Sequence, residues 1–385
     1  MPEFALEIAS KLPNVGTTIF TVMSRLAQEC NAINLSQGFP DFDCDPALQD
    51  RVTHYMKAGY NQYPPMAGVV PLREAIAEKV QALYGARYDP EHEITVTPGG
   101  TYAIFTAVAT VIRPGDEVIV FEPTYDSYVP AIETMGGKPV YVRLRFPDYS
   151  IDWEAVQAAI TPRTRMIMIN TPNNPTGSVF SADDMRALAR VLRGTPIVVL
   201  SDEVYEHIVF DGAQHQSAAR FPELAERSFI VSSFGKTYHV TGWKMGYCIA
   251  PKALMTEFRK VHQFNCFTCN TPVQYALADY MQNKDAYLGL AEFYQRKRDL
   301  FNARMEKSRF VRMPNSGTFF QLYRYDAISS DRDTELAIRW TREFGVASIP
   351  VSVFYHEPVY DRVIRFCFAK KDETLERGAE LLCGI

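Results

Sequence analysis

Short apolar runs alternate with helical segments through the middle of this chain, from residue 93 to about residue 250. Runs such as 117–121 and 197–200 are predicted as strands, and segments such as 182–192 as helices. This alternation is typical of a mainly parallel sheet whose two faces are covered by helices. The sequence therefore predicts an α/β fold.

The rest of the chain predicts a second, smaller unit. The 385 residues, of which 47% are hydrophobic, suffice for more than one core, so we expect two domains. Segment 288–305 is predicted as one helix that leads away from the parallel sheet. The strands and helices expected at 319–322, 334–344 and 373–382 would form the smaller unit.

Charge and hydropathy argue against several classes of protein. A net charge of −5 and a pI near 5.9 provide no basic surface for nucleic acid or for an anionic membrane. No apolar run is long enough to span a bilayer, and the amino-terminal residues lack a signal-peptide pattern. We therefore expect neither a nucleic-acid partner nor a membrane partner.

The cysteines indicate a reducing compartment. There are seven, an odd number, spread from Cys30 to Cys383, which suits the cytoplasm better than a disulfide framework. Cys266 and Cys269 have the spacing of a redox or zinc pair, but no second pair completes a metal site. We expect no metal, and we expect this pair to pack in the core or in a pocket.

Three motifs supply the reactive groups of an enzyme. Lys236 follows Ser-Ser-Phe-Gly, Asp202 follows the apolar run 197–200, and Asn174 lies in the turn-like segment 173–177. A lysine that can condense with an aldehyde, a carboxylate at the end of a strand and an amide in a turn are the groups that hold pyridoxal phosphate as an electron sink. The motifs therefore predict this cofactor.

The same residues predict how the cofactor ring is held. Asp202 can keep the ring nitrogen protonated, and Asn174 and Tyr205 can bond to the phenolic oxygen. Lys236 supplies the imine and becomes a free amine near the α-carbon once substrate displaces it. It is then the expected general base, provided that its pKa falls well below the ~10.4 of an exposed lysine.

A phosphate site is predicted at a helix start. Residues 94–97 are expected to form a strand, 98–100 a tight turn and 101–111 a helix. Backbone amides at this start suit a phosphate, because the glycines of the turn admit close approach. Ser233 and Lys244 can add a hydroxyl group and a positive charge.

Each residue taken alone has a simpler interpretation. Tyr125 follows the strand at 117–121 and can stack on the ring, but a single tyrosine there is typical of a core. Asp202 alone is commonly a helix cap, segment 173–177 a turn, and Lys236 a solvated lysine. The order and spacing of the whole set favour the cofactor site.

Arg365 is the candidate for binding a substrate carboxylate. Its planar guanidinium matches a carboxylate bidentately, and its apolar neighbours predict a buried strand in which a lone charge would be costly. A structural ion pair is the alternative. We favour substrate binding, because an enzyme that acts on amino acids must anchor a carboxylate.

These motifs resemble those of the class I aminotransferases, which are fold type I pyridoxal-phosphate enzymes. The resemblance extends from residues 34–42 to residues 364–371 and is greatest with the branch that holds bacterial methionine aminotransferases and kynurenine aminotransferases. It implies a large domain at 41–287 with a mainly parallel seven-stranded sheet, and a small α+β domain at 288–385. The arm at 1–40 would belong in part to the small domain.

The resemblance also implies a role for each cofactor-binding residue. Lys236 would form the imine, Asp202 would pair with the ring nitrogen, and Asn174 and Tyr205 would contact the phenolic oxygen. Tyr125 would stack on the ring. The residues that would hold the phosphate are Gly100, Thr101, Ser233 and Lys244.

Substrate binding and assembly follow from the same resemblance. Arg365 and Asn174 would bind the α-carboxylate, with help from the backbone near Gly38. Tyr63 would reach the phosphate region of a neighbouring subunit, in a homodimer with shared active sites. Two departures are visible: Ser36 stands where many relatives have glycine, and some relatives place histidine near Thr268.

The expected substrates have apolar side chains. Segments that should approach the side chain contain Phe20, Tyr63, Tyr102 and Phe267, and none offers a second cation. We therefore predict a ping-pong aminotransferase that moves the amino group of methionine and aromatic amino acids to a 2-oxo acid.

Other functions remain open at this point. Kynurenine or glutamine could be the preferred donor, because small changes of contact shift preference. A carbon–sulfur β-lyase acting on cysteine conjugates or cystathionine would use the same cofactor residues. A binding or regulatory relative without catalysis is disfavoured, because Lys236, Asp202 and Arg365 are all present.

Overall fold

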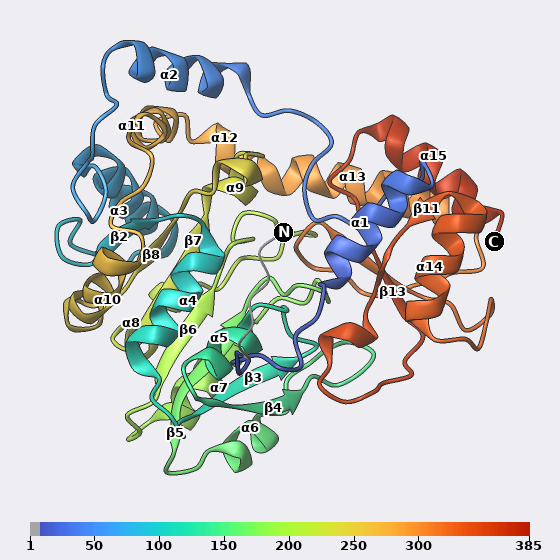
Figure 1. Cartoon of the computed structure of the whole chain (residues 1–385), viewed down its shortest axis with the longest axis horizontal. Coiled ribbons are helices and arrows are strands. Elements are labelled where there is room, and N and C mark those ends of the chain that lie inside the picture. Colours follow the sequence, from blue (N-terminus) through green and yellow to red (C-terminus); the bar gives the residue numbers. More distant parts are fainter. Residues whose placement is uncertain (1–7) are drawn as a thin grey trace.

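The computed structural model describes residues 8–385, and its centre is a seven-stranded sheet with the order β2-β8-β7-β6-β5-β3-β4 (Figure 1). In the described chain, β8 runs antiparallel to both of its neighbours and every other neighbouring pair is parallel. The strands are β2 (Ile94–Thr97), β3 (Glu117–Glu122), β4 (Lys138–Arg143), β5 (Thr164–Asn170), β6 (Val198–Asp202), β7 (Ser228–Ser233) and β8 (Gly246–Ile249). The predicted α/β fold is confirmed.

Helices cover both faces of this sheet because successive strand residues point to opposite sides. Val118 and Val120 pack in one core with α4, α5 and α10, while Ile119 and Phe121 belong to the other core, which includes α3, α6 and α7. These helices are α3 (Val70–Tyr84), α4 (Gly100–Val111), α5 (Tyr128–Thr134), α6 (Trp153–Ala159), α7 (Ala182–Leu192) and α10 (Lys252–Asn265). The sheet is therefore buried on both faces, as its apolar strands require.

A second unit combines the amino-terminal and carboxy-terminal parts of the chain. Its four-stranded sheet has the order β12-β13-β10-β9, and β1 (Ile33–Asn34) pairs in parallel with β11 (Val346–Ala347). The sheet strands are β9 (Val311–Arg312), β10 (Phe320–Arg324), β12 (Ile349–Pro350) and β13 (Val363–Cys367). The helices around it are α1 (Ile19–Glu29), α13 (Leu290–Met305), α14 (Asp333–Phe344) and α15 (Asp372–Cys383).

The division of the chain at residues 40 and 287 stays a prediction. Residues 1–7 of the predicted arm lie outside the described residues. The remaining short elements are α2 (Pro46–Lys57), α8 (Pro222–Ala225), α9 (Phe234–Thr237), α11 (Thr271–Tyr280), α12 (Asp285–Leu288) and the 3₁₀ turns η1 (Ala218–Arg220), η2 (Thr241–Trp243) and η3 (Ser352–Phe354).

One predicted helix begins at the wrong residue. The sequence suggested a single helix over 288–305, whereas α12 ends at Leu288 and α13 begins at Leu290. Gly289 lies between them with ψ −8°, and glycine is a poor helix former. The end of α13 at Met305 agrees with the prediction.

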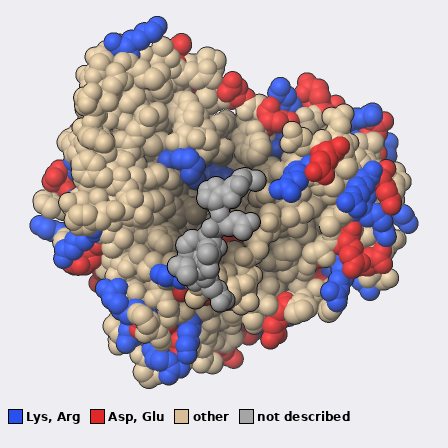
Figure 2. Space-filling view, viewed as in Figure 1, with Lys and Arg blue, Asp and Glu red and all other residues tan. Residues whose placement is uncertain are grey.

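Acidic and basic side chains are interspersed on the face shown in Figure 2. Within residues 8–385, no helix is both long enough and apolar enough to cross a membrane.

Candidate active site

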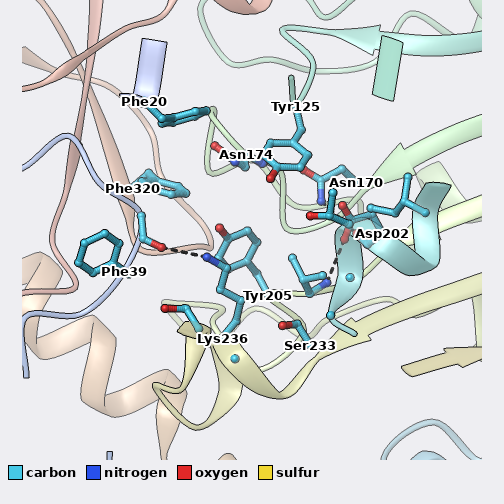
Figure 3. A pocket seen from close by; sticks show the side chains of 18 of the residues that line it. Phe20, Phe39, Tyr125, Asn170, Asn174, Asp202, Tyr205, Ser233, Lys236 and Phe320 are labelled. Atoms are coloured by element: carbon cyan, nitrogen blue, oxygen red, sulfur yellow. Dashed lines mark hydrogen bonds between the residues drawn. The ribbon is translucent and has the colours of Figure 1, made fainter. Parts of the chain in front are cut away.

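A cavity of about 280 Å³ lies at the carboxyl ends of the central strands, where ligands bind in open α/β sheets (Figure 3). Asn170 ends β5, Asp202 ends β6 and Ser233 ends β7, and all three line the cavity. The second unit supplies the facing wall, with Phe20 from α1 and Arg365 from β13. The site therefore needs both units.

Most of the predicted site residues converge on this cavity, but Tyr63, Tyr102 and Phe267 do not line it. The residues that line it are Phe20, Gly38, Gly100, Thr101, Tyr125, Asn174, Asp202, Tyr205, Ser233, Lys236, Lys244 and Arg365. Tyr63 does not line it: its side chain is 83% exposed and packs against Phe267, with ring centroids 5.4 Å apart. Tyr102 also lies outside the cavity lining, and its hydroxyl is 3.0 Å from His262 Nδ1.

Lys236 presents a desolvated amine to the cavity. It lies in α9, directly after β7, and its Nζ donates a hydrogen bond of 2.9 Å to the carbonyl oxygen of Gly38. Burial lowers the pKa of Lys236 to about 8, and the charge of Arg365 acts in the same direction. A substantial fraction of the amine is therefore neutral near pH 8, which is the form that acts as nucleophile or base.

Asp202 is a buried carboxylate that accepts a hydrogen bond from Tyr128, a residue that was not predicted to belong to the site. Tyr128, in α5, donates a hydrogen bond of 2.5 Å to Asp202 Oδ2. Burial raises the pKa of Asp202 to about 6, while the bond from Tyr128 acts in the opposite direction. Asp202 is thus mainly ionised at neutral pH. No local pattern identifies Tyr128, because its partner is 74 residues away.

Asn170 is a second residue whose role was not recognised. Its Nδ2 donates to the Asp202 carbonyl oxygen at 3.0 Å, and its Oδ1 accepts from the Asn174 backbone at 2.7 Å. It therefore ties the end of β6 to the turn that carries Asn174. Its place after the apolar run 166–169 is the sequence feature that could have indicated this role.

The start of α4 is built to receive an anion. Gly99 precedes it with φ +84°, and no side chain caps the first turn. A Cβ at Gly100 would lie 2.9 Å from the side chain of Val204. Only glycine therefore lets the backbone at this position lie so close to Val204. Lys244 Nζ would lie 3.5 Å from a Cβ at Gly99, which puts a positive charge beside free amides and the positive helix end.

Arg365 is a fully buried cation whose hydrogen bonds go to neutral groups. Nη1 donates to Asn174 Oδ1 at 2.6 Å, and Nη2 donates to the Ser36 carbonyl oxygen at 3.1 Å. Its guanidinium carbon lies 3.8 Å from the centroid of the Phe320 ring. Burial lowers the pKa of Arg365 to about 10, so the group remains charged at neutral pH.

Arg365 forms no ion pair in the described part of the chain. Within residues 8–385, no carboxylate forms a salt bridge with it, and its buried Nε has no hydrogen-bond partner. A buried charge without an anion is costly unless a ligand supplies one. The cavity next to Arg365 therefore suits a carboxylate.

The two departures from the resemblance do not disturb this geometry. Ser36 is buried, and its N–H and hydroxyl donate to Asn34 Oδ1 at 3.0 and 2.7 Å, so its carbonyl oxygen is left to accept from Arg365. Thr268 is half-buried and does not line the cavity.

The cysteine pair has ordinary partners. Cys266 Sγ lies 3.2 Å from the Thr268 carbonyl oxygen, and Cys269 Sγ lies 3.6 Å from that of Val96. All seven cysteines are free thiols. In the described part of the chain, no group of three or more His, Cys, Asp or Glu side chains is arranged to hold a metal ion.

Comparison with known proteins identifies the class to which this fold and site belong. The model of the aminotransferase class I and II family matches residues 31–382, and the chain belongs to that family. It is an aminotransferase, as the cavity residues suggested.

Individual relatives agree with this assignment. The chain is similar to the methionine aminotransferase of Escherichia coli, with 50% identity over 374 residues and 97% of each chain covered. The crystal structure of a methionine aminotransferase from Escherichia coli matches with a TM-score of 0.96 and 48% identity, and covers 99% of this chain and 100% of that chain. A probable N-succinyldiaminopimelate aminotransferase of Mycobacterium tuberculosis is 38% identical, and human kynurenine–oxoglutarate transaminase 1 is 31% identical, each with 97% of both chains covered.

Proposed function

We propose that this aminotransferase holds pyridoxal 5′-phosphate on Lys236 and transfers the amino group of methionine and of aromatic amino acids to a 2-oxo acid. The observation that carries the proposal is the buried Lys236 amine, with its pKa near 8, facing a cavity between Asp202 and Arg365. When bound, the cofactor supplies the electron sink that accepts the charge left by removal of the α-proton.

The residues around the cavity fit this cofactor. The amides at the start of α4, Ser233 and Lys244 would hold the phosphate, because they combine free donors with a positive charge. Asp202 would pair with the protonated ring nitrogen, and its bond from Tyr128 favours the ionised form that this needs. Tyr125 would lie against the ring.

Asn174 and Tyr205 would form hydrogen bonds with the phenolic oxygen of the cofactor. Asn174 also contacts Arg365, so it links the cofactor site to the site for the substrate carboxylate. Its amide oxygen already accepts from Arg365, which leaves its Nδ2 free to donate to an acceptor in the cavity. A substrate α-carboxylate would then bind Arg365 beside Asn174, with the Gly38 backbone nearby. This arrangement fixes the α-carbon near Lys236.

Lys236 Nζ would take the proton from the α-carbon. In its neutral form it has a lone pair for that proton, and burial makes this form accessible near neutral pH. After the first 2-oxo acid leaves, a second one would receive the amino group by the same steps in reverse.

The cavity favours apolar substrate side chains. The cations that line it are Lys236, Lys244 and Arg365, and each already has a role above. Among the described residues that line the cavity, no further cation is left for a distal carboxylate, whereas Phe20, Phe39 and Phe320 provide apolar surface. Kynurenine and glutamine remain second candidates as donors, because a relative that acts on kynurenine is also similar.

The first prediction concerns the lysine. Reduction of the holoenzyme with borohydride, followed by peptide mapping, should give a stable cofactor adduct on Lys236. Lys236→Ala should bind the cofactor without an adduct and lose transamination, because both the covalent anchor and the base are gone. A label on another lysine would contradict the assignment.

The second prediction concerns the substrate. Single-turnover conversion of the cofactor to its amino form should be faster with methionine, phenylalanine and tyrosine than with aspartate, because the distal carboxylate of aspartate would lose hydration without a partner. A faster reaction with aspartate would refute the preference. Release of ammonia and a keto acid from a cysteine conjugate, without formation of the amino form, would instead favour the β-lyase.

We also propose a homodimer with shared active sites. Tyr63 and Phe264 are exposed by 83% and 88%, and Tyr63 does not line the cavity of its own chain, which supports a role at a neighbouring one. Lys236→Ala and Tyr63→Ala proteins, each impaired alone, should regain part of the activity when subunits exchange. A fully active monomer in sedimentation would contradict this proposal.

A further inference from the structure

A short segment of the second unit bridges to the large sheet next to the active site. We call residues 352–356 the strap. At its start, the N–H and hydroxyl of Ser352 donate to the carboxylate of Asp333 at 2.7 and 2.6 Å, which anchors it on α14. Further along, the carbonyl oxygen of Phe354 accepts from the Thr124 backbone at 2.9 Å.

The end of the strap is held by one buried carboxylate. Glu122 is the last residue of β3, and only 1% of its surface is exposed. Its Oε1 accepts from the backbone of His356 at 2.5 Å, and its Oε2 accepts from His356 Nδ1 at 2.8 Å. Within residues 8–385, His356 is the one basic residue paired with Glu122. Burial of the Glu122 carboxylate without hydrogen-bond donors would cost free energy. The hydrogen bonds from His356 therefore stabilise the contact between the two units.

The imidazole of His356, although 38% exposed, also makes an aromatic contact. It stacks on Tyr141 of β4, with ring centroids 3.9 Å apart and an angle of 2° between the planes. His356 does not itself line the cavity. Its contacts therefore define the position of the strap and not that of a bound ligand.

The strap carries one aromatic side chain to the substrate wall. Phe354 is buried, its ring centroid lies 5.7 Å from the guanidinium carbon of Arg365, and it lies 6.0 Å from the ring of Phe20. Both neighbours line the cavity. Movement of Phe354 would open space beside the arginine and the phenylalanine that face the substrate.

We propose that His356 is a positioning residue for substrate binding: by its two bonds to Glu122 it fixes the strap, and through Phe354 it fixes Arg365 and Phe20. This inference rests on the proposed function, because it assumes that Arg365 receives the substrate carboxylate. The contact between Glu122 and His356 would then contribute to the affinity for substrate and would not contribute to binding of the cofactor.

The test measures binding of 4-(methylsulfanyl)butanoate, which is methionine without its amino group, to the holoenzyme. His356→Ala should raise its Kd, and the KM for methionine, by roughly fivefold to twentyfold, with a smaller change in kcat and an unchanged affinity of the apo-protein for pyridoxal phosphate. His356→Asn, which retains a side-chain donor, should recover part of this loss. The matched control is His92→Ala, because His92 pairs with Asp89 at 2.5 Å on the exposed surface.

Two further measurements separate positioning from a general loss of stability. Hydrogen exchange of residues 352–356 in the cofactor-free chain should accelerate in His356→Ala, while exchange in β5 and β6 stays slow. Glu122→Gln should also raise the Kd for 4-(methylsulfanyl)butanoate. In the His356→Ala background, Glu122→Gln should raise this Kd by a smaller factor than it does in the wild type, because the double variant contains no unpaired buried charge at this contact.

The outcomes distinguish this inference from the proposed function. An unchanged Kd in both His356→Ala and Glu122→Gln, with wild-type binding intact, would overturn the inference alone. If Arg365→Lys binds the ligand as well as the wild type does, the proposed carboxylate site fails, and the inference fails with it.

Discussion

The active site depends on the burial of the Lys236 amine where two units of the chain meet. The lysine comes from the helix after β7, its hydrogen-bond acceptor is the Gly38 carbonyl oxygen, and Arg365 approaches from β13. Desolvation, more than any single charge, lowers the pKa of this amine. If the units separated, water would reach the amine and its pKa would rise towards the usual value.

The far side of the sheet supports the residues that face the cavity. Glu206 directly follows Tyr205 in the chain, and it accepts hydrogen bonds from Lys79 at 2.6 Å and from Ser232, the neighbour of Ser233. Burial acts to raise the pKa of Glu206, but the charge of Lys79 and the hydrogen bonds from Lys79 and Ser232 act together to hold the pKa below its usual range. Loss of Lys79 would leave the buried charge of Glu206 without its cation. The pair therefore holds α3 against the segment after β6, and the bond from Ser232 joins that segment to β7.

The sequence predicted the parts of the site that lie at the ends of strands. Asp202, Ser233 and the turn at Gly100 follow apolar runs, and the carboxyl ends of parallel strands meet at one edge. It did not predict Tyr128 or the contact of Glu122 with His356, because these pairs are 74 and 234 residues apart and no periodicity encodes them. Tyr102 and Phe267 were expected near the substrate, yet neither lines the cavity, since aromatic character alone does not give direction.

The central claim is that burial makes the Lys236 amine reactive near neutral pH. The most direct test is competitive labelling of the cofactor-free chain with acetic anhydride over a range of pH, in which mass spectrometry follows the peptide that contains Lys236. We expect its reactivity to rise with a midpoint near pH 8, as burial lowers the pKa to about that value. A midpoint at the ~10.4 of an exposed lysine would contradict the account.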